Sequence, residues 1–296
     1  MDVLSQILRS HSAGAVLLSR CDYREPWGVA LESNHTAGLH FVESGSCYLR
    51  CGDREPLHLL QGDVAVLPHG SAHVLSDSAH RRAISLEAFL ARPPESGPYT
   101  ARVICAAQRF EIDPRRLHPF FHELPPVIHL EHATIQSCAH LGPCLRLLLM
   151  ELQSETPGRG ALVELLLEAF LAYVIRHWIQ CHGRPDGWVG VLRDSRLNRV
   201  VSLIHEEPER GWTVAELASL AAMSRPAFAK SFVKFVGESP LAYVTRLRME
   251  RAGERLRTGD ESVAEIAQSV GYASEFAFSR AFKRVVGMTP SSFRAM

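Results

Sequence analysis

The feature that most constrains this chain is an internal repeat of about fifty residues in its C-terminal third. Each copy has an apolar segment of helical period, a tight turn, and a second such segment that ends at a glycine. With one extra residue in the second turn, the matched pairs are Thr213/Ser262, Leu217/Ile266, Ala218/Ala267, Ser224/Ser274, Phe228/Phe278, Phe232/Phe282, Gly237/Gly287 and Pro240/Pro290. Two short helices joined by a tight turn form a helix-turn-helix. The repeat therefore predicts two such units, at residues 213–237 and 262–287.

Local signals define the ends of these helices. Thr213-x-x-Glu216 and Ser262-x-x-Glu265 have the capping-box pattern, and Ser224 is placed to cap the following helix. A helix from residue 241 to about 257 is expected between the units, roughly 25 Å long at 1.5 Å per residue. A rod of that length can set two recognition helices into successive major grooves about 34 Å apart. Four phenylalanines are core by their spacing: Phe228, Phe232, Phe278 and Phe282.

Charge and composition separate the two halves of the chain. Lys and Arg total 32, as do Asp and Glu, yet residues 196–296 hold fifteen basic and eleven acidic side chains. All seven cysteines and fourteen of the fifteen histidines precede residue 200. A mildly basic module attached to an acidic one suggests nucleic acid as the partner of the first.

The stretch from Ile266 to Arg294, IAQSVGYASEFAFSRAFKRVVGMTPSSFR, resembles the signature of AraC/XylS-type transcription regulators. The resemblance covers about residues 196–296. It implies that one monomer contacts two adjacent major grooves of promoter DNA, and that the protein activates transcription with RNA polymerase as a partner. By position, the implied DNA contacts are Arg225, Pro226, Ala229 and Lys230 in the first unit, and Glu275, Phe276, Ala277, Ser279 and Arg280 in the second.

Chemistry narrows these contacts. The side chains of Pro226 and Ala229 cannot form hydrogen bonds, so base readout by the first unit rests on Arg225 and Lys230. Arg280 is the strongest single candidate, because an arginine can bridge O6 and N7 of guanine for roughly 1–3 kcal/mol of discrimination.

The N-terminal part alternates in the manner of short strands. Residues 39–42, 47–50, 57–60 and 64–67 are separated by Gly, Ser, Asp and Pro turns, which favours an all-β sandwich or barrel. Residues 62–73, Gly-x5-Pro-x-Gly-x2-His, match the second cupin motif, and residues 39–45 and 52–55 resemble the cupin domains fused to AraC-type modules. This second resemblance covers about residues 1–130.

The same resemblance raises the question of a metal. Metal-binding cupins supply His-x-His and a Glu from their first motif, whereas here Gly38 stands at the Glu position and no His-x-His precedes it. His35, His40 and His73 remain as a candidate set for zinc or a similar divalent ion, since three imidazoles leave an open position. The alternative is that His40 and His73 are ordinary interior residues of the barrel.

Two cysteines offer a different sensing chemistry. Cys21 is flanked by Arg20 and Arg24, which would favour its thiolate. Cys105 lies in an expected strand. AraC-type regulators with this kind of cupin domain include oxidant-responsive members, and Cys21 and Cys105 resemble the positions that such members use. The resemblance implies oxidation to a sulfenic acid or a Cys21–Cys105 disulfide. The alternative, that cysteine acts as a small buried hydrophobe, is assigned to Cys47, Cys51, Cys138, Cys144 and Cys181.

Amphipathic helices are expected at residues 145–155 and 161–181, around a break at 156–160. They pack against a neighbouring domain or form the interface of a homodimer, which would place four helix-turn-helix units on DNA. Residues 181–187 are the expected linker.

Together these patterns predict an α+β multidomain protein. It has a cupin-like β-barrel at residues 1–130, a helical connector and possible dimer interface at 131–187, and an all-α double helix-turn-helix domain at 188–296. We expect a cytoplasmic transcription regulator, since no uncharged apolar run approaches the roughly 20 residues of a membrane span and no secretory signal opens the sequence. The signal is oxidation of the two cysteines or, alternatively, a metal or small ligand. A rival from another class is a metal-dependent cupin enzyme, against which the missing Glu and His-x-His weigh.

Overall fold

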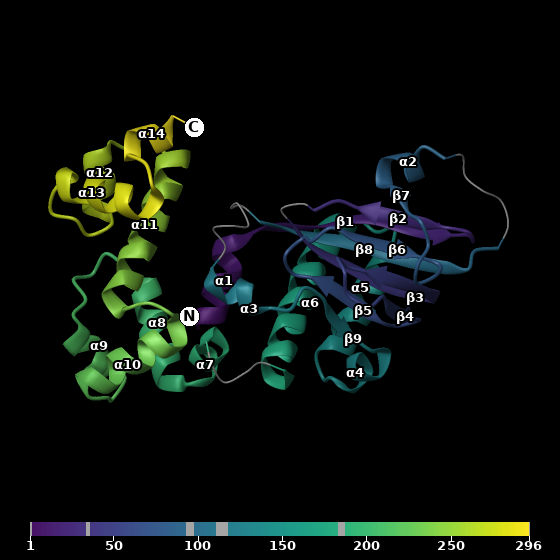
Figure 1. Ribbon diagram of the computed structural model, residues 1–296, viewed down its shortest axis with the longest axis horizontal. Helices are drawn as coiled ribbons and strands as arrows, with labels where there is room; N and C mark the ends of the chain where they lie inside the picture. The colour runs from purple at the N-terminus through teal and green to yellow at the C-terminus, as the bar shows by residue number, and fades with distance from the viewer. Residues whose placement is uncertain (1, 34–35, 93–97, 111–117, 183–186, 296) are drawn as a thin grey trace. The chain divides into compact units, whose positions relative to one another are not determined.

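The computed structural model describes residues 2–33, 36–92, 98–110, 118–182 and 187–295 (Figure 1). The chain divides into two compact units. Residues 8–183 form one, here called the barrel unit. Residues 1–7 together with 184–296 form the other, the helical unit. Helix α1 (Val3–His11) contributes residues to both.

The barrel unit contains nine strands among its described residues. They are β1 (Ser12–Tyr23), β2 (Gly28–Leu31), β3 (Thr36–Arg50), β4 (Leu57–Leu60), β5 (Val64–Leu67), β6 (His73–Ser76), β7 (Ile84–Ser85), β8 (Ala101–Phe110) and β9 (Ile128–Leu130). The helices are α2 (Leu86–Leu90), α3 (Pro119–Glu123), α4 (His132–Ser137), α5 (Leu141–Gln153) and α6 (Arg159–Cys181). The expected cupin-like fold is confirmed by this arrangement together with the family match given below.

Strand β3 is a single long strand, where the sequence predicted two separate strands with a turn between them. Its first half pairs with β5 and β8, and its second half pairs with β4 and β6. The polar residues around Ser44 shift the register against β8 instead of reversing the chain. Gly45 has a φ of +74°, and a Cβ there would collide with the carbonyl oxygen of Thr100. The predicted turn was therefore wrong: the extra residue is Glu43, and β3 continues through Gly45, whose lack of a Cβ lets it pass close to Thr100.

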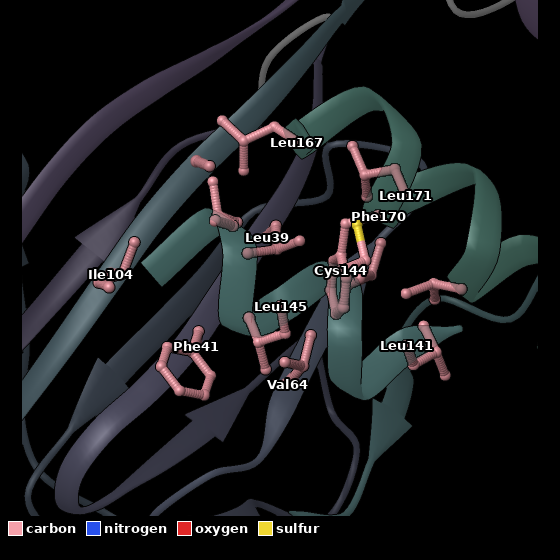
Figure 2. Packing of buried hydrophobic residues seen from close by; sticks show 14 of the residues in the cluster. Leu39, Phe41, Val64, Ile104, Leu141, Cys144, Leu145, Leu167, Phe170 and Leu171 are labelled. Carbon is pink, nitrogen blue, oxygen red and sulfur yellow. The ribbon is translucent and has the colours of Figure 1, made fainter. Parts of the chain in front are cut away.

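Alternation along the strands builds two separate cores. One face of β3, β5 and β8 packs under α5 and α6 through Leu39, Phe41, Val64, Ile104 and their neighbours (Figure 2). The opposite face, with Val42, Val103 and Cys105, joins Trp27, Cys47 and Leu75 inside the barrel. The two expected amphipathic helices are thus present, and their buried sides, including Phe170 and Val174, pack on the sheet.

The helical unit contains α7 (Gly187–Arg193), α8 (Ser195–Glu206), α9 (Val214–Leu220), α10 (Arg225–Val236), α11 (Pro240–Thr258), α12 (Val263–Ser269), α13 (Glu275–Val286) and α14 (Pro290–Arg294). Both expected helix-turn-helix units are confirmed, as α9–α10 and α12–α13, with α11 between them. The four phenylalanines expected in the core are fully buried. Ser262 and Glu265 form the expected capping box, whereas the carboxylate of Glu216 pairs with Arg210.

Arg248 of α11 joins the two helix-turn-helix units. Its guanidinium donates to the carbonyl oxygens of Pro208, Glu209 and Arg210, at 2.6, 3.0 and 2.9 Å, and to that of Gly271 in the second turn, at 3.4 Å. Gly271 has a φ of +82°, and a Cβ on it would collide with the carbonyl oxygen of Glu209. The turn of the second unit is therefore fixed against the loop that precedes α9.

The first residues of the chain pack within the helical unit. Val3 and Ile7 are fully buried, and the Gln6 side chain donates to the carbonyl oxygen of Ser202 in α8 at 3.4 Å. Each helix in the described part of the chain is too short or too polar to cross a membrane.

Candidate DNA interface and sensory site

The first turn of α13 presents three of the expected DNA-contact residues. The Ser274 hydroxyl accepts a hydrogen bond from the Ala277 amide and caps the helix. Glu275, Phe276 and Ala277 are all exposed, and the Phe276 ring is 72% exposed. One turn further on, the Arg280 guanidinium carbon lies 5.8 Å from the centre of that ring. The helix therefore offers an aromatic ring and a cation side by side.

A surface hollow of about 660 Å³ lies along the same helix. Arg280, Lys283 and Arg284 contribute three cations to its lining, together with Phe276 and Ala277. Lys283 and Arg284 were not among the contacts expected from the sequence. The signal that could have found them is the basic pair directly after Phe282, which continues the exposed face beyond Arg280. Ser279, the remaining expected contact on α13, is half-buried.

Helix α10 repeats this arrangement in the first unit. Ser224 caps it by accepting from the Ala227 amide, and Arg225, Pro226 and Lys230 are exposed. Ala229 is half-buried. The structure thus places all nine expected contact positions at least partly on the surface, while the phenylalanines that alternate with them lie inside.

The barrel interior holds a chain of hydrogen bonds that the sequence did not predict. His40 on β3 lies directly opposite Cys105 on β8, and its Nδ1 is 3.1 Å from the Cys105 sulfur. Its Nε2 is 2.7 Å from Nε2 of His73, whose Nδ1 is 2.8 Å from the carbonyl oxygen of Ser71. The three side chains come from β3, β8 and β6, so only the pairing of distant strands brings them together.

The direction of this chain follows from its last acceptor. A carbonyl oxygen can only accept, so Nδ1 of a neutral His73 donates to Ser71 and its Nε2 accepts from His40. Nδ1 of His40 is then left as an acceptor, and the Cys105 thiol donates to it. We call this set, Cys105, His40, His73 and the Ser71 carbonyl, the thiol–imidazole chain.

Burial keeps the thiol–imidazole chain uncharged. It raises the pKa of the Cys105 thiol to about 12 and lowers the pKa of His40 well below its usual value, with the neighbouring His73 as a second cause. The pKa of His73 is lowered for the same reason. At neutral pH the group therefore consists of a thiol and two neutral imidazoles.

Cys21 lies beside this group. On β1 it pairs with Val103, two residues from Cys105 on the same face of β8, and it is half-buried. Both cysteines are free thiols. Arg20 precedes Cys21 on β1, and successive side chains of a strand point to opposite faces. Arg20 instead donates to the Glu43 carboxylate at 2.8 Å.

The candidate metal set is not assembled in the described residues. The ring nitrogens of His40 point in opposite directions, one at Cys105 and one at His73, so these groups do not converge on one point. Among the residues that the structure describes, no three or more His, Cys, Asp or Glu side chains are grouped to hold a metal ion. His35, the third expected ligand, lies outside the described residues.

Known proteins are similar to this chain over almost its whole length. The family profile described as "Cupin" matches residues 2–180, and that described as "Helix-turn-helix domain" matches residues 217–296. An AraC-like transcription regulator of Streptomyces antibioticus is 32% identical over 99% of this chain and 98% of its own length. The HTH-type transcriptional regulator AlkR of Acinetobacter baylyi is 29% identical, covering 99% of each chain.

A further relative is the RCS-specific HTH-type transcriptional activator RclR of Escherichia coli. It is 29% identical over 99% of this chain and 97% of its own. Among solved structures, the DNA-binding domain of AdpA in complex with a target DNA is 34% identical over 33% of this chain and 87% of that one, with a TM-score of 0.32. From its two family profiles and its full-length relatives, this chain belongs to the AraC-type DNA-binding transcription regulators with an N-terminal cupin domain, and it is a regulator and not an enzyme.

Proposed function

We propose that this regulator senses a two-electron oxidant through Cys21 and Cys105 and that their oxidation alters how it engages promoter DNA in the cytoplasm. The observation that carries the proposal is the thiol–imidazole chain, which provides Cys105 with a hydrogen-bonded base inside an otherwise apolar barrel. The RclR relative, whose name refers to reactive chlorine species and to activation, supports hypochlorous acid as the oxidant and activation as the outcome.

The proposed chemistry assigns a different role to each cysteine. Cys21 is the more accessible of the two, so hypochlorous acid converts its thiol to a sulfenic acid and releases HCl. The Cys105 sulfur then attacks the Cys21 sulfur, a disulfide forms, and hydroxide leaves. His40 Nδ1 accepts the Cys105 proton as the bond forms, and that proton joins the hydroxide as water.

The disulfide requires a strand to move. Diagonal neighbours on paired strands have Cα atoms about 7–8 Å apart, whereas a disulfide usually spans 4.4–6.8 Å. The irregular register of β1 between Leu17 and Ser19 lies just before Cys21 and gives this strand room to shift. Since α1 leads directly into β1, the movement reaches the residues that pack in the helical unit.

Thiol mapping by mass spectrometry before and after one equivalent of hypochlorous acid tests this proposal. We expect a Cys21–Cys105 peptide only after oxidation, none in Cys21→Ser or Cys105→Ser, and normal formation in the matched control Cys144→Ser, whose thiol is buried in the other core. In His40→Ala, a sulfenic acid trapped at Cys21 should persist while the disulfide forms more slowly. If both thiols stay free after the oxidant is added, oxidation of this pair is not the signal, and a metal or small ligand in the barrel takes its place.

For the DNA contacts, we propose that Arg280 reads a guanine. In the first helix-turn-helix unit, we propose that Arg225 and Lys230 read the bases. The support is their exposure on the capped recognition helices α13 and α10. Arg280→Ala should weaken specific binding about fivefold or more, the discrimination of one bidentate pair, with less effect on non-specific DNA. Arg54→Ala, at an exposed arginine of the barrel unit, removes the same charge elsewhere and should leave the affinity unchanged. Equal losses on specific and non-specific DNA would remove Arg280 from base readout.

We propose a homodimer formed through the outer sides of α5 and α6. Those helices expose four large apolar side chains: Leu147 at 52%, Met150 at 66%, Leu162 at 45% and Leu165 at 62%. In analytical ultracentrifugation the wild-type protein should sediment as a dimer and Leu165→Glu as a monomer. Leu90→Glu on α2, at a leucine that is 64% exposed, is the matched control and should remain dimeric. A monomeric wild-type protein at micromolar concentration would contradict the proposal.

A further inference from the structure

The Phe276 ring has no place in the core of the helical unit. It is 72% exposed, while Phe278 and Phe282 on the same helix are fully buried and Phe293 is 7% exposed. An exposed phenylalanine forgoes roughly 1.5–3 kcal/mol of burial, so its position on the first turn of a recognition helix points to a partner that covers it.

The surroundings of the ring fit DNA better than an apolar protein surface. The Arg280 guanidinium lies 5.8 Å from the ring centre, and Lys283 and Arg284 line the same hollow. Three cations that line one hollow with this ring would be costly to bury against a second apolar surface. They are complementary to the phosphates that flank a major groove.

Within the major groove, thymine is the base that offers an apolar contact, because its C5-methyl group projects there. Phe276 and Arg280 are four residues apart, which places them on the same helix face about one turn, or 5.4 Å, apart. Base pairs are spaced about 3.4 Å along each strand, so the two side chains can reach neighbouring base pairs.

We infer that Phe276 is a specificity-determining residue that contacts the 5-methyl group of a thymine next to the guanine read by Arg280. The inference rests on the proposed readout by Arg280 and adds a second base to it. The pair reads one thymine and one guanine through two different chemistries, apolar contact and a bidentate hydrogen bond. The Phe276 ring also holds the Arg280 guanidinium in place.

The test uses the full chain and an operator selected from a random DNA pool. Each thymine near the selected guanine is replaced in turn by deoxyuridine, which removes only the methyl group. For wild-type protein, one such replacement should weaken binding about fourfold, as for the loss of one buried methyl. Phe276→Ala should bind the unmodified operator at least fourfold more weakly and be insensitive to that replacement. Lys283→Ala, a matched change on the same helix, should keep the wild-type sensitivity.

The possible failures are distinguishable. Equal sensitivity to deoxyuridine in wild type and Phe276→Ala, or none in either, would overturn the thymine contact while leaving sequence-specific binding and Arg280 readout intact. A selection that enriches no sequence, or an Arg280→Ala protein with unchanged specificity, would instead overturn the proposed readout itself. An unfolding midpoint for Phe276→Ala that matches wild type shows that the comparison concerns DNA and not folding.

Discussion

Two phenylalanines six residues apart on α13, Phe276 and Phe282, lie in opposite environments. Phe282 is fully buried, with its ring centre 5.6 Å from that of Phe278 and 5.5 Å from that of Phe293, whereas Phe276 is mostly exposed. We expect Phe282→Ala to lower the free energy of unfolding by about 3–5 kcal/mol, because it leaves a cavity. Phe276→Ala should change it by about 0.5 kcal/mol or less. Urea unfolding, with hydrogen exchange at α13 to localise the effect, measures both; similar losses would contradict the assigned environments.

The buried histidines give the stability a pH dependence. In the folded protein the pKa of His40 and His73 is lowered, so near pH 6.5 and below the unfolded chain binds protons that the folded chain does not. The free energy of unfolding should therefore fall as the pH falls below about 6.5, by at most about 1.4 kcal/mol per pH unit for each histidine. His40→Gln should reduce that slope. If His40→Gln and the wild-type protein lose unfolding free energy equally between pH 6.5 and 5, His40 does not remain neutral in the folded protein.

At the scale of single residues, the sequence predicted which positions are exposed or buried on a helix better than it predicted side-chain contacts in the barrel. The exposed and buried positions of α10 and α13 followed from the helical period, since both sides of a helix are defined within a dozen residues. The thiol–imidazole chain did not, although His40, His73 and Cys105 had each been singled out. Their contacts depend on the register of β3 against β8 and on the position of β6, which no local pattern encodes.

At the scale of elements, the same local information explains why the two helix-turn-helix units were predicted closely and β3 was not. Caps, terminal glycines and a repeat defined each helix end. The residues around Gly45 contain ordinary turn residues, and only the pairing with β8 shows that they form a bulge within one strand.

Two glycines of similar backbone conformation should respond very differently to alanine. Gly271 and Gly287 have φ values of +82° and +88°. At Gly287 no atom lies within 4 Å of an added Cβ, so Gly287→Ala should cost only the left-handed strain of about 1–2 kcal/mol. Gly271→Ala should cost several kcal/mol more, because the Glu209 backbone must move and Arg248 loses its geometry. Thermal unfolding compares them; equal costs would show that the two helix-turn-helix units are not held together at this point.

At the scale of the whole molecule, the chain begins in the helical unit, passes through the barrel unit and returns. If a protease site is introduced at residues 183–186 and cut, the fragments should still co-elute, because residues 1–7 keep the barrel unit attached. Ile7→Ala removes part of a fully buried side chain, at a cost of about 2–5 kcal/mol, and should allow the cut fragments to separate. Uncut Ile7→Ala is the control. Separation of the cut wild-type protein would contradict this attachment.

The barrel unit is thus an insertion in the helical unit, joined at both of its ends. A sensor joined at one end can swing on its linker without affecting the part that reads DNA. A sensor joined at both ends has two covalent connections to that part, so a movement at either end passes into the chain that follows it. If the proposed disulfide shifts β1, that shift passes along the chain into α1, whose first residues belong to the helical unit.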